Sequence, residues 1–403
     1  MSAGAAGAVG LRTPRRYQLN KHALAIVRSG HPWIFRDQLS SAAAVFASGQ
    51  WLRLVAGDNQ VVGHGVYEAD GAIAIRVLSR GAERPRAPSW RARVEAALAR
   101  RAPLRAETDA WRALHGESDG LPAVVVDVFG DVVVAQSYSA GVDGLTRWAG
   151  RLVADHVGAR AVVWRPARRR VGAVRSGPPG AGAAEPGRLL RGVLDGPVTV
   201  REGDRRLVVD ARAGQKSGSY LDLRGLRRHV AALPLAGARV LNLFAFTGGL
   251  ATAAGAAGAG EVWNVDASEA ALAHAAAHHD PPGAIVRQIK ADIFTWLGGL
   301  DAAESFALVI VDPPSMTSRI EQVPAVLASY RRLYQAAGRH VAAGGVLLAA
   351  CCTSRVTRAQ FDRAVREGLG AGFTHELDLL PELDHPATFA EARYLKIAQY
   401  RRR

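Results

Sequence analysis

Hydrophobic positions in the C-terminal part of the chain form short apolar runs that alternate with amphipathic stretches. Buried parallel strands read as continuous apolar runs, and the connection between two of them is usually a helix. The expected strands lie at 239–244, 261–266, 307–311 and 345–350, and the expected helices near 250–257, 268–278, 324–340 and 358–367. We therefore expect an α/β fold, with a parallel sheet that is covered by helices on both faces.

The N-terminal part, from about residue 16 to 82, shows a different pattern. Short apolar segments alternate there with Gly and Asp turns, at 51–55, 61–67 and 73–78. This spacing is typical of a small β-rich module. Its opening loop, Ser29 to Phe35, carries aromatic and imidazole groups that can stack on bases. Trp33 and Phe35 fit equally the core of a small barrel, so both interpretations stay open.

A middle region combines helical and strand patterns. From 88 to 113, Ala, Leu and Trp recur at three- and four-residue spacing, which predicts a helix. The run VVVDVFGDVVVAQS predicts a hairpin that turns at Gly130-Asp131. A further helix is expected at 145–157, and further strands at 161–164, 198–200 and 205–209.

Residues 165–191 carry few signals of regular structure. They open with RPARRRVGAVR and continue through GPPGAGAAEPG. Such composition predicts a basic loop rather than a packed element. The loop is either solvated or in contact with RNA phosphates.

Composition limits the class of protein. A chain of 403 residues with 49% hydrophobic content suggests two or three domains with real cores. Gly, Arg or Asp interrupts every apolar run before it reaches the length of a membrane span, and the N-terminal residues read as a frayed terminus rather than a signal peptide. The two cysteines are adjacent and cannot form a disulfide framework, so we expect a cytosolic location.

The net charge of +15 is carried almost entirely by arginine. We give no weight to the choice of arginine over lysine, because a GC-rich genome favours it. The surplus itself points to a polyanionic partner, most simply nucleic acid, with solubility alone as the alternative.

Candidate chemistry follows the expected strands, at the ends where parallel sheets bind ligands. Thr247-Gly248-Gly249 joins a strand to a helix, so its backbone can approach a ligand closely and the helix start offers free N–H groups. Asp266 ends the next strand and suits the ribose hydroxyls of a nucleoside cofactor. Asp292 suits an adenine amino group, unless it is only a helix N-cap. The absence of G-x-G-x-x-G argues against NAD.

Two further motifs indicate binding and chemical modification of a nucleobase. Asp312-Pro313-Pro314 predicts a rigid loop whose carbonyls can accept hydrogen bonds from a base amino group, although a plain turn is the alternative. Cys351 and Cys352 end another strand and point to opposite faces. One is expected in the core and the other can act as a nucleophile, because a thiolate added to C6 of cytosine makes C5 able to attack a methyl sulfonium. Adjacent cysteines without partners do not match metal-ligand spacing.

Together and in this order, the motifs resemble the class I rRNA methyltransferases of the large-subunit methyltransferase I family. Those enzymes make 5-methylcytidine in 23S rRNA with S-adenosylmethionine. His31-Pro32-Trp33-Ile34-Phe35 resembles the start of the family's PUA domain, and GESDGLPAVVVDVFGD its middle α/β module. GQKSGSYLDLR, at 214–224, is similar to a family segment written G-Q-K-T-G-F-F-L-D-Q-R. Asp384-His385-Pro386 and Tyr394-Leu395-Lys396 match its closing elements.

The resemblance implies a three-part organisation. A PUA-like RNA-binding domain is expected at 14–84, a middle α/β module with the basic loop at 88–210, and a Rossmann-like class I methyltransferase domain at 211–403. It also implies S-adenosylmethionine as cofactor, RNA as partner with 23S rRNA as the expected target, and formation of 5-methylcytidine in the cytoplasm. No metal and no membrane association are expected, and a homodimer is considered.

The resemblance also assigns site residues. Cys352 falls where the family places its catalytic cysteine, in a Ser-Cys-Ser context that reads Cys-Cys-Thr here, and Asp312 is expected to act with it. His385 is considered as the base that removes the C5 proton or as a structural histidine. The expected cofactor-binding positions are Gln215, Tyr220, Arg224, Phe244, Thr247, Gly248, Gly249, Asp266, Ala267, Asp292, Ile293, Asp312 and Pro313. The expected substrate-binding positions are Pro314, His31, Trp33, Arg168 and Arg169.

The chain departs from the family at two positions. Ser315 stands where the family often has Lys, and Asn242 where an acid often begins the first cofactor motif. Because Ser315 lies close to where another class of RNA cytosine methyltransferases carries its nucleophile, catalysis here would depend on Cys352 alone. The alternatives are a related methyltransferase that modifies a guanine nitrogen or another base, and a non-catalytic RNA-binding protein. The sequence gives neither the target nucleotide nor the maturation state of the RNA.

Overall fold

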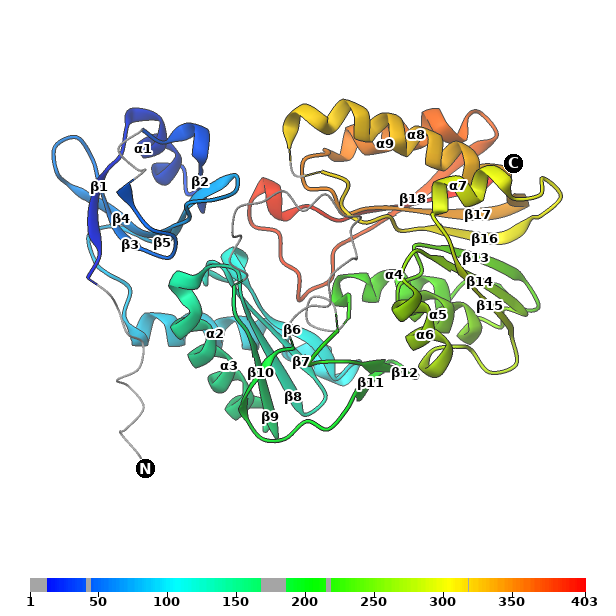
Figure 1. The fold of residues 1–403 in the computed structure, drawn as a ribbon, viewed down its shortest axis with the longest axis horizontal. Coiled ribbons are helices and arrows are strands. Elements are labelled where there is room, and N and C mark those ends of the chain that lie inside the picture. The colour runs from blue at the N-terminus through cyan, green and yellow to red at the C-terminus, as the bar shows by residue number, and fades with distance from the viewer. Residues whose placement is uncertain (1–12, 41–44, 168–185, 215–218, 318) are drawn as a thin grey trace. The chain divides into compact units, whose positions relative to one another are not determined.

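A computed structural model describes residues 13–40, 45–167, 186–214, 219–317 and 319–403 (Figure 1). The chain divides into two compact units, each built from segments that are distant in sequence. The first unit comprises Met1–Gly203, Val209–Leu221 and Leu383–Phe389. The second comprises Asp204–Val208, Asp222–Glu382 and Ala390–Arg403. No helix in the described ranges has both the length and the apolar character needed to cross a bilayer.

The N-terminal part of the first unit is a five-stranded sheet in the order β1-β3-β4-β5-β2. The strands are β1 Arg15–Gln18, β2 Trp33–Phe35, β3 Trp51–Val55, β4 Val61–Tyr67 and β5 Ile73–Arg80. Helix α1, Lys21–Arg28, begins after Asn20, whose side-chain oxygen accepts a hydrogen bond from the Ala23 N–H at 2.8 Å. The predicted β-rich module is confirmed, because the apolar segments bounded by turns are its strands.

The first unit contains a second five-stranded sheet, in the order β10-β9-β8-β7-β6. Its strands are β6 Ala110–His115, β7 Val124–Phe129, β8 Val132–Ser137, β9 Ala161–Arg165 and β10 Arg188–Arg191. Helices α2, Ala87–Arg101, and α3, Asp143–Val157, accompany it. Strand β11, Val198–Glu202, also belongs to the first unit, whereas most of β12, Arg205–Val209, belongs to the second. The predicted hairpin is confirmed: β7 and β8 pair antiparallel around Gly130, whose φ of 58° lies in the left-handed region that the tight turn requires.

Two predictions for this region were wrong. The helix expected over 88–113 ends at Arg101, and a short 3-10 turn at Ala102–Ala106 follows it. Pro103 supplies no backbone N–H to continue the helix, and Trp111 instead pairs with Val128 across the sheet. The last residues of the expected basic loop, Arg188–Arg191, form edge strand β10 against β9. Residues 168–185 lie outside the described residues.

The second unit is organised around a seven-stranded sheet in the order β15-β14-β13-β16-β17-β19-β18. The strands are β13 Arg239–Leu243, β14 Glu261–Asp266, β15 Ile285–Lys290, β16 Phe306–Val311, β17 Val341–Cys351, β18 Phe373–Leu379 and β19 Lys396–Arg402. The pairs from β15 to β17 are parallel, as predicted. Strand β19 pairs antiparallel with β17 and β18, which the sequence had not indicated.

Helices cover both faces of this sheet, as predicted. Figure 1 shows α7, α8 and α9 on one face and α4, α5 and α6 on the other. Their bounds are α4 Arg224–Ala231, α5 Gly249–Ala256, α6 Glu269–His278, α7 Ile293–Gly299, α8 Val323–Arg339 and α9 Arg358–Leu369. The main core cluster lies on the α8 side, where Leu241, Leu243 and Tyr330 are buried together. Asn242 is buried too but belongs to the opposite side, because side chains alternate along a strand.

Candidate active site

The order of the parallel strands reverses between β13 and β16, and this reversal locates the candidate site. The chain runs from β13 to β14 and β15 on one side and from β16 to β17 on the other. Leu243 and Val311, the last residues of β13 and β16, are register partners, so the loops after both strands leave from the same edge. In open parallel sheets, ligands bind in the crevice outside the strand ends at such a switch point.

The loop after β13 holds an unusual backbone conformation. Phe244 and Phe246 have φ angles of 61° and 48°, which few residues other than Gly adopt, and Gly248 follows with 81°. The Asp266 carboxylate at the end of β14 fixes this loop, since it accepts the Phe246 N–H at 2.9 Å and the Ser268 N–H at 2.8 Å. Strain of this kind is typical of ligand-binding loops and persists only where neighbours enforce it.

His279 supports the same loop from beneath and was not foreseen from the sequence. Its Nε2 accepts the Val208 N–H at 2.8 Å, and its Nδ1 donates to the Thr247 carbonyl. This pattern requires the neutral ring. Burial lowers the pKa of His279 to about 4, although the hydrogen bond to Thr247 acts in the opposite direction. The imidazole is therefore a fixed spacer between β12 and the loop.

We expect acid to weaken the second unit through His279. The folded-state pKa of about 4 lies below the ordinary value of 6.5, so the unfolded chain binds more protons between these values. Stability is therefore present above pH 6.5 and is lost as the pH falls toward 4, by about 3 kcal/mol over the whole window. Urea unfolding at several pH values checks this. A His279→Gln variant should lose less stability over the same range, and equal losses in the two proteins would contradict the assignment.

The other strand-end acid on this side has a structural role. Asp292 follows β15 and caps α7, where its Oδ1 accepts from the Thr295 N–H at 3.0 Å and from the Thr295 hydroxyl at 2.9 Å. Within the chain, the contacts of Asp292 are therefore those of a helix N-cap. Ala267 is exposed beyond β14, whereas Ile293, the first residue of α7, is buried in the core.

The residues after β16 and β17 meet at the thiol of Cys352. Cys352 is half-buried, and its Sγ lies 3.6 Å from the carbonyl oxygen of Pro313 in the Asp-Pro-Pro loop. Pro313 is buried and Pro314 is exposed, so the loop presents one proline outward. Cys351 is fully buried in the apolar cluster and accepts a hydrogen bond from the Tyr330 hydroxyl at 3.3 Å. Only the second cysteine is therefore placed to react with a ligand.

A buried polar network fixes the turn that carries Cys352. The Thr353 hydroxyl lies 3.0 Å from the Tyr330 hydroxyl and accepts the Met316 N–H at 3.2 Å. The Lys396 ammonium donates to the carbonyls of Thr353 at 3.0 Å and Val356 at 2.9 Å. These contacts join the loops after β16 and β17 to the start of β19. No role of Tyr330, Thr353 or Lys396 was predicted from the sequence, although Thr353 and Lys396 belong to motifs that carry the family resemblance.

The segment before α4 was expected to border the cofactor. Gln215 lies outside the described residues, as do Arg168 and Arg169 of the basic loop. Tyr220 is half-buried in the first unit. Arg224 is buried in the second unit and donates to Oε2 of Glu382 through Nε at 3.0 Å and Nη2 at 2.8 Å.

The aromatic loop of the N-terminal sheet forms a half-buried cluster. The ring centroid of Trp33 lies 4.8 Å from that of Phe389, and His31 lies 5.8 Å from the same ring. The Trp33 indole N–H donates to Glu117 at 2.7 Å, and Arg76 pairs with the same carboxylate. The two rings predicted to bind substrate therefore pack against neighbours while remaining partly accessible.

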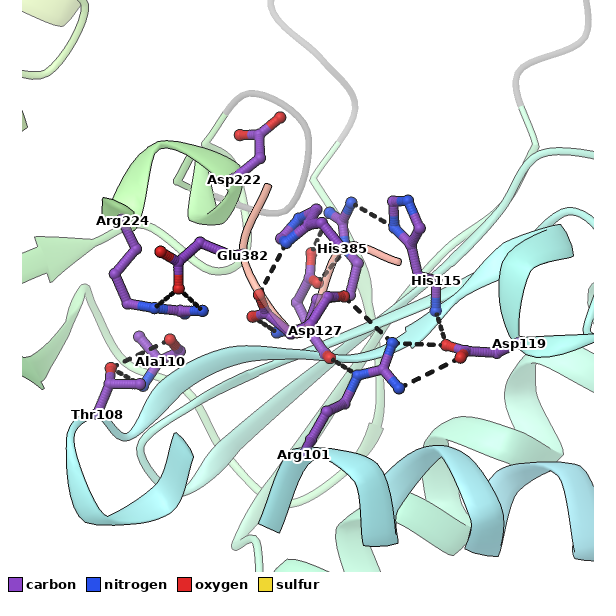
Figure 2. Close-up of polar contacts among 12 residues, drawn as sticks. Arg101, Thr108, Ala110, His115, Asp119, Asp127, Asp222, Arg224, Glu382 and His385 are labelled. Carbon is purple, nitrogen blue, oxygen red and sulfur yellow. Dashed lines mark hydrogen bonds and ion pairs between the residues drawn. The ribbon is translucent and has the colours of Figure 1, made fainter. Parts of the chain in front are cut away.

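A buried ionic network in the first unit surrounds His385 (Figure 2). Asp119 accepts from Nη1 and Nη2 of Arg101 at 3.2 and 2.7 Å, and Arg101 also donates to the Asp384 carbonyl at 3.1 Å. The Asp384 carboxylate lies 2.9 Å from Nδ1 of His385. Burial lowers the pKa of the adjacent His115 to about 2, so this histidine stays neutral. Within its own unit, His385 thus has a partner for its Nδ1 in Asp384.

The strand-end edge of the second unit fits a nucleoside cofactor. Each oxygen of Asp266 accepts one backbone N–H and keeps a second lone pair, which a ribose hydroxyl can use. Gly248, the N-cap of α5, lies in the left-handed region, where a side chain would be strained, and a Cβ there would lie 2.9 Å from the Cβ of Ala275. The glycine thus lets the loop turn tightly above α6 and leaves the start of α5 open to a ligand.

Comparison with protein families gives two matches. Residues 189–396 match a family described as S-adenosylmethionine-dependent methyltransferase, and residues 18–80 match a PUA-like domain. A protein from Deinococcus radiodurans named ribosomal RNA large subunit methyltransferase is 34% identical over 98% of both chains. One from Aeromonas salmonicida named ribosomal RNA large subunit methyltransferase I is 30% identical over 91% of this chain and 94% of its own.

Solved structures show the same fold. A proposed S-adenosylmethionine-dependent methyltransferase from Streptococcus mutans superposes with a TM-score of 0.80 and covers 96% of this chain and 100% of its own, at 17% identity. A proposed methyltransferase solved with S-adenosylhomocysteine gives the same score and coverage at 18% identity. At these identities the likeness concerns the fold alone.

Proposed function

The chain belongs to the S-adenosylmethionine-dependent methyltransferase family, and on this premise we propose that it methylates C5 of a cytosine in large-subunit ribosomal RNA. The observation that carries the proposal is the position of Cys352. The thiol is half-buried, lies against the carbonyl of Pro313 and follows a strand at the edge that fits the cofactor. A methyltransferase that acts on a nitrogen or an oxygen needs no cysteine there.

The residues that would hold the cofactor belong to the loops after β13 and β14. Asp266 suits the ribose hydroxyls, and Thr247, Gly248 and Gly249 offer backbone atoms at the start of α5. S-adenosylmethionine, when bound, supplies an electrophilic methyl group for C5 of the base. Phe244, Asp312 and Pro313 follow the neighbouring strands and are proposed to complete this pocket.

In the proposed reaction Cys352 makes and breaks one bond. Its thiolate adds to C6 of the cytosine, and the electron pair of the C5–C6 double bond moves to C5, which becomes nucleophilic. After C5 has been methylated, a base removes the C5 proton, and the electrons of that bond expel the thiolate as the double bond reforms. Asp312 and the carbonyls of the Pro313-Pro314 loop are proposed to hold the amino edge of the base.

Three observations support RNA as the substrate. The two bacterial relatives carry names that refer to ribosomal RNA of the large subunit. A PUA-like domain accompanies the methyltransferase part, and the net charge of +15 suits a polyanion. Because C5 and C6 of a stacked cytosine are not accessible to a thiol, we expect the target base to be flipped out.

Nucleoside mapping tests the proposed reaction. We expect mass spectrometry of ribosomal RNA from cells lacking this gene to show the loss of one 5-methylcytidine in 23S rRNA. Expression of the unsubstituted chain should restore it. Loss of a methylated guanine in place of the methylcytidine would refute the cytosine assignment and leave the methyltransferase fold as found.

A further inference from the structure

Lys396 places a cation inside the second unit, directly behind the Cys352 turn. It is one of four lysines in the chain, begins β19 and is 5% exposed. Its Nζ donates to the carbonyls of Thr353 and Val356, which are neutral acceptors. Within the described ranges no carboxylate forms an ion pair with it. A buried charge is normally paired, so the missing anion requires an explanation.

The neighbouring thiols are the groups that can supply this anion. Burial lowers the pKa of the Lys396 ammonium, while Cys351 and then Cys352 act to raise it. Such an interaction is mutual, because an ammonium that is favoured by a thiolate favours that thiolate equally. Cys351 is fully buried and bonded to Tyr330, whereas Cys352 is half-buried and can meet a substrate. Cys351 is the register partner of Lys396 and has the larger effect on the ammonium, but only Cys352 can meet a substrate, so its thiolate is the one through which the cation bears on catalysis.

The turn itself is held from both sides. The carbonyl of Thr353 accepts from Lys396 and from the Val356 N–H at 3.2 Å, which closes the turn. The Thr353 hydroxyl is held by Met316 and Tyr330. Because Cys352 directly precedes Thr353, these contacts leave its backbone little freedom.

We propose that Lys396 is a positioning residue for Cys352, and that its ammonium fixes the turn carrying the thiol and stabilises the thiolate from the buried side. The inference rests on the proposed function, because the thiolate is used in the proposed methyl transfer. The ionisable groups that interact with the pair include Tyr330 from α8, Cys351 from β17 and Arg358 from α9. Arg355 lies in the turn itself, and Asp312 precedes Pro313 in the adjacent loop. A test has to keep these groups constant.

Alkylation of the thiol as a function of pH tests the proposal without RNA. A Cys351→Ser background leaves Cys352 as the single thiol and keeps an acceptor for Tyr330. In that background, Lys396→Gln removes the charge and retains an N–H donor for the carbonyls, while Lys396→Met removes both. Lys290→Met is the matched control, because Lys290 is exposed and pairs with Glu269 at 2.6 Å.

We expect Lys396→Gln to move the midpoint of the iodoacetamide reaction upward by about one pH unit, which lowers the rate at neutral pH about tenfold. Lys396→Met should shift it at least as far, and Lys290→Met should leave it unchanged. An unshifted profile in Lys396→Gln would overturn the proposal. The proposal would also be overturned if the Cys351→Ser protein that keeps Lys396 reacted with a midpoint at or above about 8.5, the ordinary cysteine pKa. That outcome does not depend on whether the Lys396 variants fold.

The same variants separate this inference from the proposed function. Alkylation reports the ionisation of Cys352 and does not require methyl transfer. A shifted profile combined with full RNA methylation by a Cys352→Ala protein would support the action of Lys396 on the thiol and refute the covalent mechanism. A shifted profile combined with about tenfold slower methylation by Lys396→Gln at neutral pH would support both.

Discussion

Replacement of Cys352 by Ala is expected to reduce RNA methylation at least about a thousandfold, because removal of a nucleophile that acts as part of a unit abolishes the covalent route. Cys352 is the half-buried cysteine and lies against Pro313, so no other thiol can replace it in the proposed mechanism. Transfer of a labelled methyl group from S-adenosylmethionine to ribosomal RNA, at saturating cofactor, measures the change. Binding of the cofactor should be unaltered, because Phe246 and Asp266 remain in place.

Cys351→Ala is the matched control for this experiment. The side chain lies in the apolar cluster, and its loss removes one hydrogen bond from Tyr330 and a small buried volume. We expect a loss of stability of about 1–2 kcal/mol and methylation within severalfold of the unsubstituted chain. Full activity in Cys352→Ala would refute the covalent mechanism, and loss of activity in Cys351→Ala alone would show that the two roles had been exchanged.

The fold could be predicted from the sequence where each strand carries a complete local signal. The runs of β13, β14 and β16 are buried on both faces, so they appear in the sequence as nearly continuous apolar segments, interrupted by Asn242 in β13 and Asn264 in β14. Strand β15 could not be recognised in this way. It lies at the edge of the sheet and alternates exposed and half-buried residues, among them Arg287, Gln288 and Lys290. Strand β18, at the opposite edge, is similarly polar.

The candidate site was also predictable from the sequence only in part. Asp266, Asp312 and Cys352 follow strands of one parallel sheet, so the rule that such strands end at one edge predicts their proximity. Lys396 contacts Thr353, which is 43 positions away in the chain, and His279 contacts Thr247, which is 32 positions away. Only the pairing of β19 with β17, and the return of α6 beneath the loop after β13, bring them there. No periodicity in the sequence predicts those two contacts.

The second large expected effect is on the stability of the first unit, and it arises from the buried network around Arg101 and Asp119. We expect Asp119→Ala to destabilise that unit by about 3–5 kcal/mol, the range found when one partner of a buried ion pair is removed. Arg101 is fully buried and would keep its charge without the carboxylate that now accepts two of its N–H groups. The backbone N–H of His115, 2.6 Å from the same carboxylate, would lose its acceptor as well.

Asp131→Ala provides the matched control, since the same substitution there removes an ion pair with Arg160 in which both side chains are 53% exposed. Exposed pairs contribute about 1 kcal/mol or less, so this variant should unfold almost as the unsubstituted chain does. Denaturant unfolding followed by tryptophan fluorescence reports mainly on the first unit, which contains six of the eight tryptophans. Binding of S-adenosylmethionine should persist in Asp119→Ala under conditions where the second unit stays folded. If both variants unfolded at the same denaturant concentration, the buried network would not stabilise the first unit, and the burial of Arg101 would have to be offset by another group.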